Sequence, residues 1–161
     1  MTVRRGVLCP WKYDDGGRED AGYTGSAGDC VTRAIAIVTG RPYSDVYGEL
    51  FAAQREFGKG RSRAAARAAK YPSPRNGVYK LVYQKWLDEA GLVWTPTMSI
   101  GSGCQVHLRP DELPSGRIIV RLSKHFAAVI DGVLHDTYDC SRGGTRCVYG
   151  YWSDSKGEDQ C

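Results

Sequence analysis

Residues 124–136 read KHFAAVIDGVLHD, and this stretch decides the fold of the second half of the chain. The dipeptide Asp131-Gly132 is a strong signal for a two-residue β-hairpin turn, and apolar residues that favour strands flank it. We therefore predict one strand over residues 126–130 and an antiparallel return strand over residues 133–138. Because apolar residues fall on both faces of this hairpin, we expect both faces to be covered.

The turn also determines which side chains share a face of the hairpin. Ala127 lies opposite Asp136 in this register, and side chains alternate between faces, so His125 and Asp136 are diagonal neighbours on one face. Their backbones are then roughly 7–8 Å apart, within reach of an imidazole–carboxylate hydrogen bond. His135 points to the other face, as would Asp139. A one-residue slip of register would reverse these assignments.

Helical patterns dominate the first half of the chain. Residues 30–39 (CVTRAIAIVT) are apolar nearly all round, which is typical of a short helix in a core. Asp29 suits the N-cap of this helix, and Gly40 suits the position after its last residue. Apolar spacing predicts further elements in both halves: helices over residues 44–57 and 78–90, a loop or frayed helix over 59–74, and strands over 92–94, 117–122 and 148–152.

Helices that precede strands in this way are typical of the α+β class. We expect helix 30–39 to be buried against an antiparallel β-sheet from the C-terminal half. A chain of 161 residues suits one domain with its own core, so we predict a single domain over residues 1–161. Residues 1–28 are expected to form an N-terminal arm or loop, and residues 153–161 a flexible tail.

Six cysteines stand at positions 9, 30, 104, 140, 147 and 161. The N-terminus has no apolar stretch of the kind found in signal peptides, and no apolar run is long enough to cross a membrane. The sequence therefore predicts a cytoplasmic protein with free thiols, in the host cytoplasm if a phage encodes it. The net charge of +4 is too small to indicate a nucleic-acid partner by itself.

Cys30 is the best candidate nucleophile. A helix N-terminus lowers the pKa of a thiol, because unpaired backbone N–H groups favour the thiolate. A thiol nucleophile needs a base, and His125 with Asp136 supplies the base and its orienting carboxylate. The alternatives are structural: Cys30 as a small buried side chain, and the His–Asp pair as part of a solvated sheet face.

These motifs together resemble the papain-like superfamily of cysteine peptidases. Gly28-Asp29-Cys30 opens a buried helix, and His125 is followed by an aromatic residue on a strand, as in the branch that processes bacteriocin leaders. The chain also looks like small uncharacterised proteins of phages and bacteria. The resemblance implies a papain-like fold and a thiol hydrolase, a peptidase or amidase, or an acyl transferase. It implies Cys30, His125 and Asp136 as the catalytic set, a thioester intermediate, no cofactor, and a protein or peptide substrate.

The sequence departs from the family at one position. Papain-like enzymes usually carry a Gln about six residues before the Cys, where it donates to the oxyanion, and here that position is Thr24. Thr24, Ser26, Asp29 or backbone N–H groups are the candidates to replace it. The alternative function is a papain-like scaffold without turnover, which binds and inhibits or recruits a host or partner protein.

Two other groups of residues are candidate sites. Cys104, His107, Cys140 and Cys147 are zinc-type ligands, but their spacing does not suit a tight zinc knuckle, and we expect no metal. Residues 55–75 carry seven basic residues and one acidic residue. This segment lacks the interleaved aromatic residues of a nucleic-acid platform, so a solvated loop is favoured over phosphate binding.

The acidic, Gly-rich segment 14–20 belongs to the N-terminal arm. Its spacing does not fit a calcium loop. One hypothesis is that this segment crosses the active cleft and brings Arg18 or Asp15 to the substrate. A polar arm without such a role is favoured.

Overall fold

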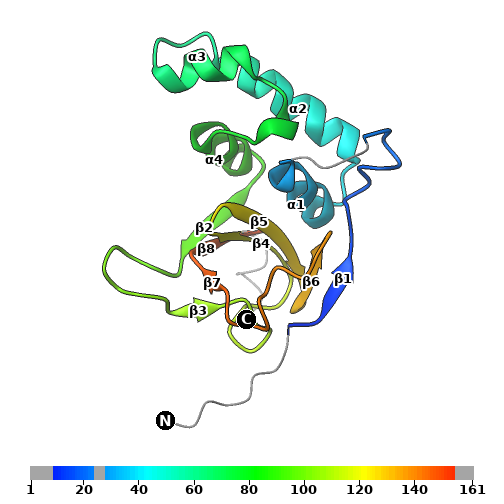
Figure 1. Ribbon diagram of the computed structural model, residues 1–161, viewed down its shortest axis with the longest axis vertical. Coiled ribbons are helices and arrows are strands. Elements are labelled where there is room, and N and C mark those ends of the chain that lie inside the picture. The colour runs from blue at the N-terminus through cyan, green and yellow to red at the C-terminus, as the bar shows by residue number, and fades with distance from the viewer. Residues whose placement is uncertain (1–8, 24–27, 155–161) are drawn as a thin grey trace.

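The structure is a computed structural model that describes residues 9–23 and 28–154 of the chain. The predicted α+β class is confirmed, since helices gather on one side of a mostly antiparallel sheet (Figure 1). The described residues form four α-helices and one 3₁₀ turn: α1 (Cys30–Thr39), α2 (Tyr43–Phe57), α3 (Arg63–Lys70), η1 (Pro74–Asn76) and α4 (Lys80–Glu89).

Helix α1 has the bounds that its sequence predicts, but its N-terminus is not capped as predicted. It ends at Gly40, whose φ of 70° is left-handed and whose N–H donates to the carbonyl of Ala36. The predicted N-cap role of the Asp29 side chain is wrong, because this carboxylate caps no helix N–H. It accepts a hydrogen bond of 2.6 Å from the Tyr43 hydroxyl instead.

Helix α3 lies within the segment expected to be a loop or a frayed helix. The Ser62 hydroxyl caps it by accepting from the N–H of Ala65. Alanine has the highest helix propensity, and Ala65 and Ala68 are buried. The basic side chains of this helix, such as Arg63 and Arg67, are exposed. The segment is therefore a capped helix with a solvated basic face.

The main sheet has six strands in the order β1-β6-β5-β4-β8-β2, and a separate pair is formed by β3 and β7. All neighbouring strands are antiparallel except β1, which runs parallel to β6. The bounds are β1 (Trp11–Tyr13), β2 (Leu92–Pro96), β3 (Val106–His107), β4 (Arg117–Leu122), β5 (His125–Ile130), β6 (Val133–Asp136), β7 (Cys147–Val148) and β8 (Gly150–Asp154).

Strand β1 corrects the expectation that the N-terminal arm has no regular structure. The hairpin leaves one edge of β6 unpaired, and an unpaired edge offers backbone donors and acceptors to any extended segment. Trp11 pairs with Leu134 there, and Tyr13 pairs with Asp136. At the other end of the chain, Ser153 and Asp154 belong to β8 and not to a tail. The rest of the predicted tail lies outside the described residues.

The predicted register of the β5–β6 hairpin is confirmed. Val129 pairs with Leu134, and Ile130 pairs with Val133. Asp131 and Gly132 have φ values of 49° and 79°, and a two-residue turn of this hand needs positive φ at both positions. Strand β6 is shorter than predicted, because it ends at residue 136.

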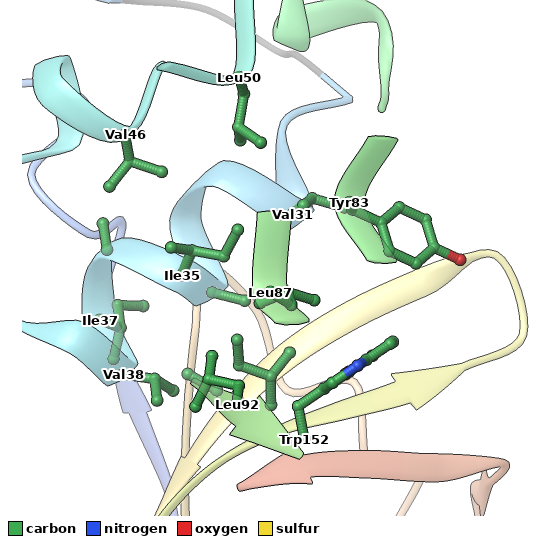
Figure 2. Close-up of a cluster of buried hydrophobic side chains, with 14 residues drawn as sticks. Val31, Ile35, Ile37, Val38, Val46, Leu50, Tyr83, Leu87, Leu92 and Trp152 are labelled. Atoms are coloured by element: carbon green, nitrogen blue, oxygen red, sulfur yellow. The ribbon is translucent and has the colours of Figure 1, made fainter. Parts of the chain in front are cut away.

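The face of the sheet that α1 covers forms the larger part of the core. Helix α1 packs on β5 and β4, and α2 and α4 close over it (Figure 1). Figure 2 shows Val46 and Leu50 of α2 pointing toward Ile35 of α1, with Leu92 and Trp152 below them on the sheet. These side chains exclude water from α1, as predicted for a helix that is apolar nearly all round.

The opposite face of the hairpin is also covered, as predicted. Val120, Val129 and Leu134 are fully buried there against Leu108 and Val148. The covering segments carry β3 and β7, and Cys9 of the arm joins them. Among the described residues, no helix is long and apolar enough to cross a membrane.

A disulfide joins Cys104 to Cys147, with a Cα–Cα distance of 5.8 Å. The prediction that all thiols are free is therefore wrong for this pair, although Cys9, Cys30 and Cys140 are free. The two cysteines are 43 residues apart in sequence, and only the pairing of β3 with β7 brings them together. Because disulfides are rare in reducing compartments, this pair runs against the expectation of free thiols that followed from the predicted cytoplasmic location.

Candidate functional site

Cys30 and His125 line the same pocket, which has a volume of about 370 Å³. The pocket lies where the start of α1 meets the beginning of β5 and the segment that follows β6. The arm contributes to it as well, so four separate segments meet there. The lining residues are Arg18, Gly28, Cys30, Arg33, Lys124, His125, Thr137 and Tyr138.

Cys30 is the first residue of α1 and is half-buried. The first hydrogen bond of the helix runs from the N–H of Arg33 to the carbonyl of Asp29. The N–H groups that precede it have no acceptor within a helix, and the Asp29 side chain does not cap them. These donors and the helix dipole favour negative charge beside the Cys30 thiol.

His125 is bound directly to Asp136. Its Nε2 lies 2.6 Å from Oδ2 of Asp136, and both side chains are buried. The other carboxylate oxygen, Oδ1, accepts from the N–H of Thr137 at 2.7 Å, which fixes the orientation of the carboxylate. The Tyr138 ring packs against the imidazole with a centroid distance of 5.4 Å. Since Asp136 occupies Nε2, Nδ1 is the ring nitrogen that remains for a second partner.

The electrostatics of this pair favour the charged forms of both partners. Burial lowers the pKa of His125, but hydrogen bonds to Asp136, Cys140 and Cys30 outweigh it and raise this pKa to about 11. Burial raises the pKa of Asp136, but the hydrogen bond and the charge of His125 bring it below its usual range. At neutral pH the pair is therefore an imidazolium and a carboxylate.

Arg33 connects this pair to the start of α1. Its Nη2 lies 3.7 Å from Oδ1 of Asp136, and its Nη1 donates to the Thr137 hydroxyl at 3.2 Å. The same Nη1 lies 3.6 Å from Oδ1 of Asp29, to which Arg18 also donates at 3.2 Å. One chain of ion pairs thus holds the arm, helix α1 and strand β6 in fixed positions around Cys30.

None of the candidate oxyanion side chains, Thr24, Ser26 and Asp29, is among the described residues that line the pocket. Thr24 and Ser26 lie outside the described residues. The Asp29 side chain is 1% exposed, and its two oxygens accept from Tyr43 and Arg18. Its carboxylate therefore anchors the arm beneath the pocket and does not line it.

Cys140 is a site residue that the sequence reasoning missed. Its thiol is buried beside the His125–Asp136 pair, and one ligand atom from each of the three residues lies within 4.8 Å of the others. Burial raises the pKa of this thiol, against the hydrogen bond to His125, which lowers it. A signal was present in the sequence, since Cys140 follows Asp136 by four residues. Its grouping with Cys147 concealed it.

The His125, Asp136 and Cys140 side chains are the group that could hold a metal ion, because nitrogen, oxygen and sulfur ligands suit zinc. A cation there would replace the proton between His125 and Asp136, and it would lie close to the Arg33 guanidinium. The charge of Arg33 opposes a cation at this position. We therefore assign a proton to the pair.

The zinc set that was weighed from the sequence does not assemble. Cys104 and Cys147 are joined in the disulfide, and Nδ1 of His107 lies 3.2 Å from a carboxylate oxygen of Glu112. Cys140 lies elsewhere, buried beside His125 and Asp136.

The remaining histidine and acidic candidates point elsewhere. His135 faces the arm, with its Nδ1 3.1 Å from Asp14. Asp139 accepts from the backbone N–H and the hydroxyl of Ser141. Asp15 accepts from N–H groups of its own turn, whereas Arg18 lines the pocket.

No family model, no curated protein and no solved structure matches the chain significantly. What the site can do follows from its own chemistry. It holds a thiol at a helix N-terminus, a protonated histidine and a buried carboxylate, in an arrangement suited to nucleophilic catalysis by a thiolate.

Proposed function

We propose that this protein is a thiol hydrolase or acyl transferase of the papain-like kind, acting on an amide. One observation carries the proposal: Cys30, at the start of α1, and His125, bound to Asp136, line one pocket. Cys30 is far from the other two residues in the sequence, while His125 and Asp136 belong to one hairpin. Their order, chemical types and surroundings are those that the papain-like resemblance implies.

The first half of the reaction is acylation of Cys30. The thiolate attacks the carbonyl carbon of the substrate amide, and the carbonyl oxygen becomes an oxyanion. When this intermediate collapses, the C–N bond breaks and the imidazolium of His125 gives its proton to the departing amine. Cys30 is left as a thioester, and Asp136 holds the imidazole in position throughout.

The second half releases the acyl group. Water, or an amine if the pocket admits one, attacks the thioester carbonyl, and the neutral imidazole of His125 accepts its proton. The C–S bond then breaks, which restores the thiolate and the imidazolium. Hydrolysis and acyl transfer differ only in the acceptor.

The protonated state of His125 favours a thiol mechanism. An imidazolium has no lone pair with which to activate a hydroxyl or a water. It is the natural partner of a thiolate, however, since a thiol and an imidazole form such an ion pair by proton transfer. The raised pKa of His125 supports this resting state.

Backbone N–H groups are the proposed oxyanion donors in place of the missing Gln. The Asp29 side chain does not cap the first turn of α1, so it does not compete with an oxyanion for the amides of that turn. Such donors contribute most when they point to the place where charge develops. The N–H of Cys30 itself is the nearest candidate along the chain.

Thiol reactivity tests the proposal. The intact protein is treated with limiting iodoacetamide at pH 5 to 9, and mass spectrometry of its peptides gives a rate for each cysteine. Cys30 should react at least tenfold faster than the buried Cys9 at pH 6, because the pKa of Cys9 is raised by burial to about 11. Cys30→Ser should abolish the fast reaction, and Cys9→Ser should leave it unchanged.

The non-catalytic binding module makes the opposite prediction. Its Cys30 would be an ordinary half-buried thiol that His125 does not activate. A Cys30 alkylation rate at pH 6 that is no faster than that of Cys9, and that His125→Gln does not alter, would reject the enzyme in favour of this alternative.

A further inference from the structure

We propose that the pocket around Cys30 selects a substrate with a carboxylate next to the scissile amide, such as a peptide with an acidic residue there. This inference rests on the proposed function, for which it names the substrate class. It is carried by the charged side chains that line the pocket.

Every charged side chain that lines the pocket is cationic or becomes so on protonation. They come from four different segments: Arg18 from the arm, Arg33 from α1, Lys124 from the turn before β5, and His125 from β5 itself. Among the described residues that line the pocket, none carries a carboxylate. A pocket of one sign attracts ligands of the opposite charge.

The carboxylates beneath the pocket do not balance these charges. Arg18 and Arg33 share Asp29, and Arg33 and His125 share Asp136. With Lys124 included, four cations face these two buried anions, and the half-buried Asp15 is a further carboxylate whose charge acts on Arg18. Lys124 shares neither Asp29 nor Asp136. Its charge is therefore available to a ligand.

Lys124 is the cation best placed to act on a ligand without a structural role. It is exposed, and it stands in the β4–β5 turn directly before His125. Its backbone has a φ of 55°, a left-handed value that residues other than glycine seldom adopt. The turn therefore holds a lysine at the rim of the pocket in a conformation that glycine would adopt more easily.

Arg18 also has an N–H donor without an acceptor among the described residues. Its Nη1 donates to Asp29, but its buried Nε has no acceptor among the described residues. Guanidinium groups bind carboxylates through paired N–H donors. The first turn of α1, which begins at the lining residue Cys30, adds backbone N–H groups that the Asp29 side chain does not cap. Side chains and backbone thus favour the same ligand chemistry.

The experiment compares two alkylating reagents of nearly equal size, anionic iodoacetate and neutral iodoacetamide. Each is applied separately to the folded full-length protein, and the rate constant at Cys30 is read by mass spectrometry. The ratio of the iodoacetate rate to the iodoacetamide rate at Cys30 is also measured on the chain unfolded in urea. That value gives the intrinsic preference of the thiol for one reagent over the other. Folding should raise the iodoacetate-to-iodoacetamide ratio at Cys30 about tenfold, and 0.5 M salt should reduce this gain because it screens the charges.

Charge variants separate the pocket from the catalytic histidine, which attracts iodoacetate by itself. Lys124→Gln should lower the ratio about two- to fivefold, and Lys124→Arg should restore it. The control is Lys59→Gln, which removes an exposed lysine beyond the end of α2 that does not line the pocket. That variant should leave the ratio unchanged.

The substrate class is then tested with fluorogenic peptides that differ at one position. Peptides with Glu beside the scissile amide should be cleaved with a higher kcat/KM than those with Gln or Lys. Matched peptide acids and amides distinguish a terminal carboxylate from a side-chain one. Lys124→Gln should reduce the advantage of Glu over Gln.

The outcomes separate the two proposals. If Cys30 reacts slowly with both reagents, the enzyme proposal fails, but the ratio still measures the charge preference of the pocket. A fast Cys30 whose ratio in the folded protein equals that in urea overturns the present inference alone. So does a raised ratio that is identical in wild type, Lys124→Gln and Lys59→Gln.

Discussion

Nε2 of His125 lies 2.6 Å from Oδ2 of Asp136, across a hairpin that separates the two residues by eleven positions. The contact joins the first residue of β5 to the last residue of β6. It follows from a tight turn at Asp131-Gly132 and from the alternation of side chains along the strands. The same geometry leaves Nδ1 of His125 for the pocket in which Cys30 lies.

Replacing Asp136 by Asn should slow the reaction of Cys30 at neutral pH. The amide keeps the shape of the carboxylate but removes its charge, so the pKa of His125 falls toward its ordinary value of 6.5. The imidazolium that stabilises the thiolate is then lost near neutrality. We expect about a 100-fold lower rate of turnover or alkylation at pH 7, measured by labelling Cys30 at a series of pH values.

Asp139→Asn is the matched control for that variant. Asp139 lies three residues after Asp136, beyond the end of β6. Its carboxylate accepts from the N–H and the hydroxyl of Ser141 and not from His125. Its replacement should change the Cys30 rate less than about twofold. A large effect of Asp139→Asn together with none of Asp136→Asn would refute the assigned role of Asp136.

The His125–Asp136 ion pair should make stability depend on pH. The pKa of His125 rises from 6.5 in the unfolded chain to about 11 in the folded protein. Its contribution to the free energy of unfolding is therefore fully present below pH 6.5 and is lost as the pH rises toward 11. The pKa of Asp136 is lowered from 3.8, so its contribution is present above pH 3.8 and is lost as the pH falls through the folded value.

Urea unfolding of wild type and His125→Gln at several pH values between 6 and 10 checks this dependence. The difference in the free energy of unfolding between the two proteins should shrink with rising pH, by at most about 1.4 kcal/mol per pH unit. A difference that stays constant over this range would mean that folding does not raise the pKa of His125.

The Cys104–Cys147 disulfide should protect both thiols and stabilise the fold. Alkylation of the unfolded chain without a reductant should leave these two cysteines unmodified, and prior reduction should expose them. The double variant Cys104→Ser/Cys147→Ser should lower the free energy of unfolding by about 2–4 kcal/mol, because the crosslink restricts the unfolded chain. Stoichiometric labelling of both cysteines before reduction would contradict the pairing.

Leu50→Ala should destabilise the protein strongly. Leu50 is fully buried between α2 and α1, so its truncation leaves a cavity, which typically costs about 2–5 kcal/mol. Leu81→Ala is the matched control, because Leu81 is also a helical leucine but is 64% exposed. Its cost should be within about 0.5 kcal/mol. Chemical denaturation of both variants gives the comparison, and equal costs would contradict the assignment of the core.

The local signals of the sequence were sufficient where neighbours in the chain are neighbours in space. The apolar run after Cys30 and the glycine at position 40 set the bounds of α1. The Asp-Gly dipeptide set the hairpin register, and the register set the contact between His125 and Asp136. Each of these rests on backbone geometry over a few residues, which residue type determines directly.

Tertiary structure alone decided what distant segments do to one another. The Asp29 carboxylate binds Tyr43 and Arg18 instead of capping α1. The arm pairs with the edge of β6. Two cysteines 43 residues apart in sequence form a disulfide. The sequence by itself determined the α+β class, helix α1 and the hairpin. Packing decided the burial of Cys140 beside His125 and the cationic lining of the pocket, because no local pattern records which segments meet when the core closes.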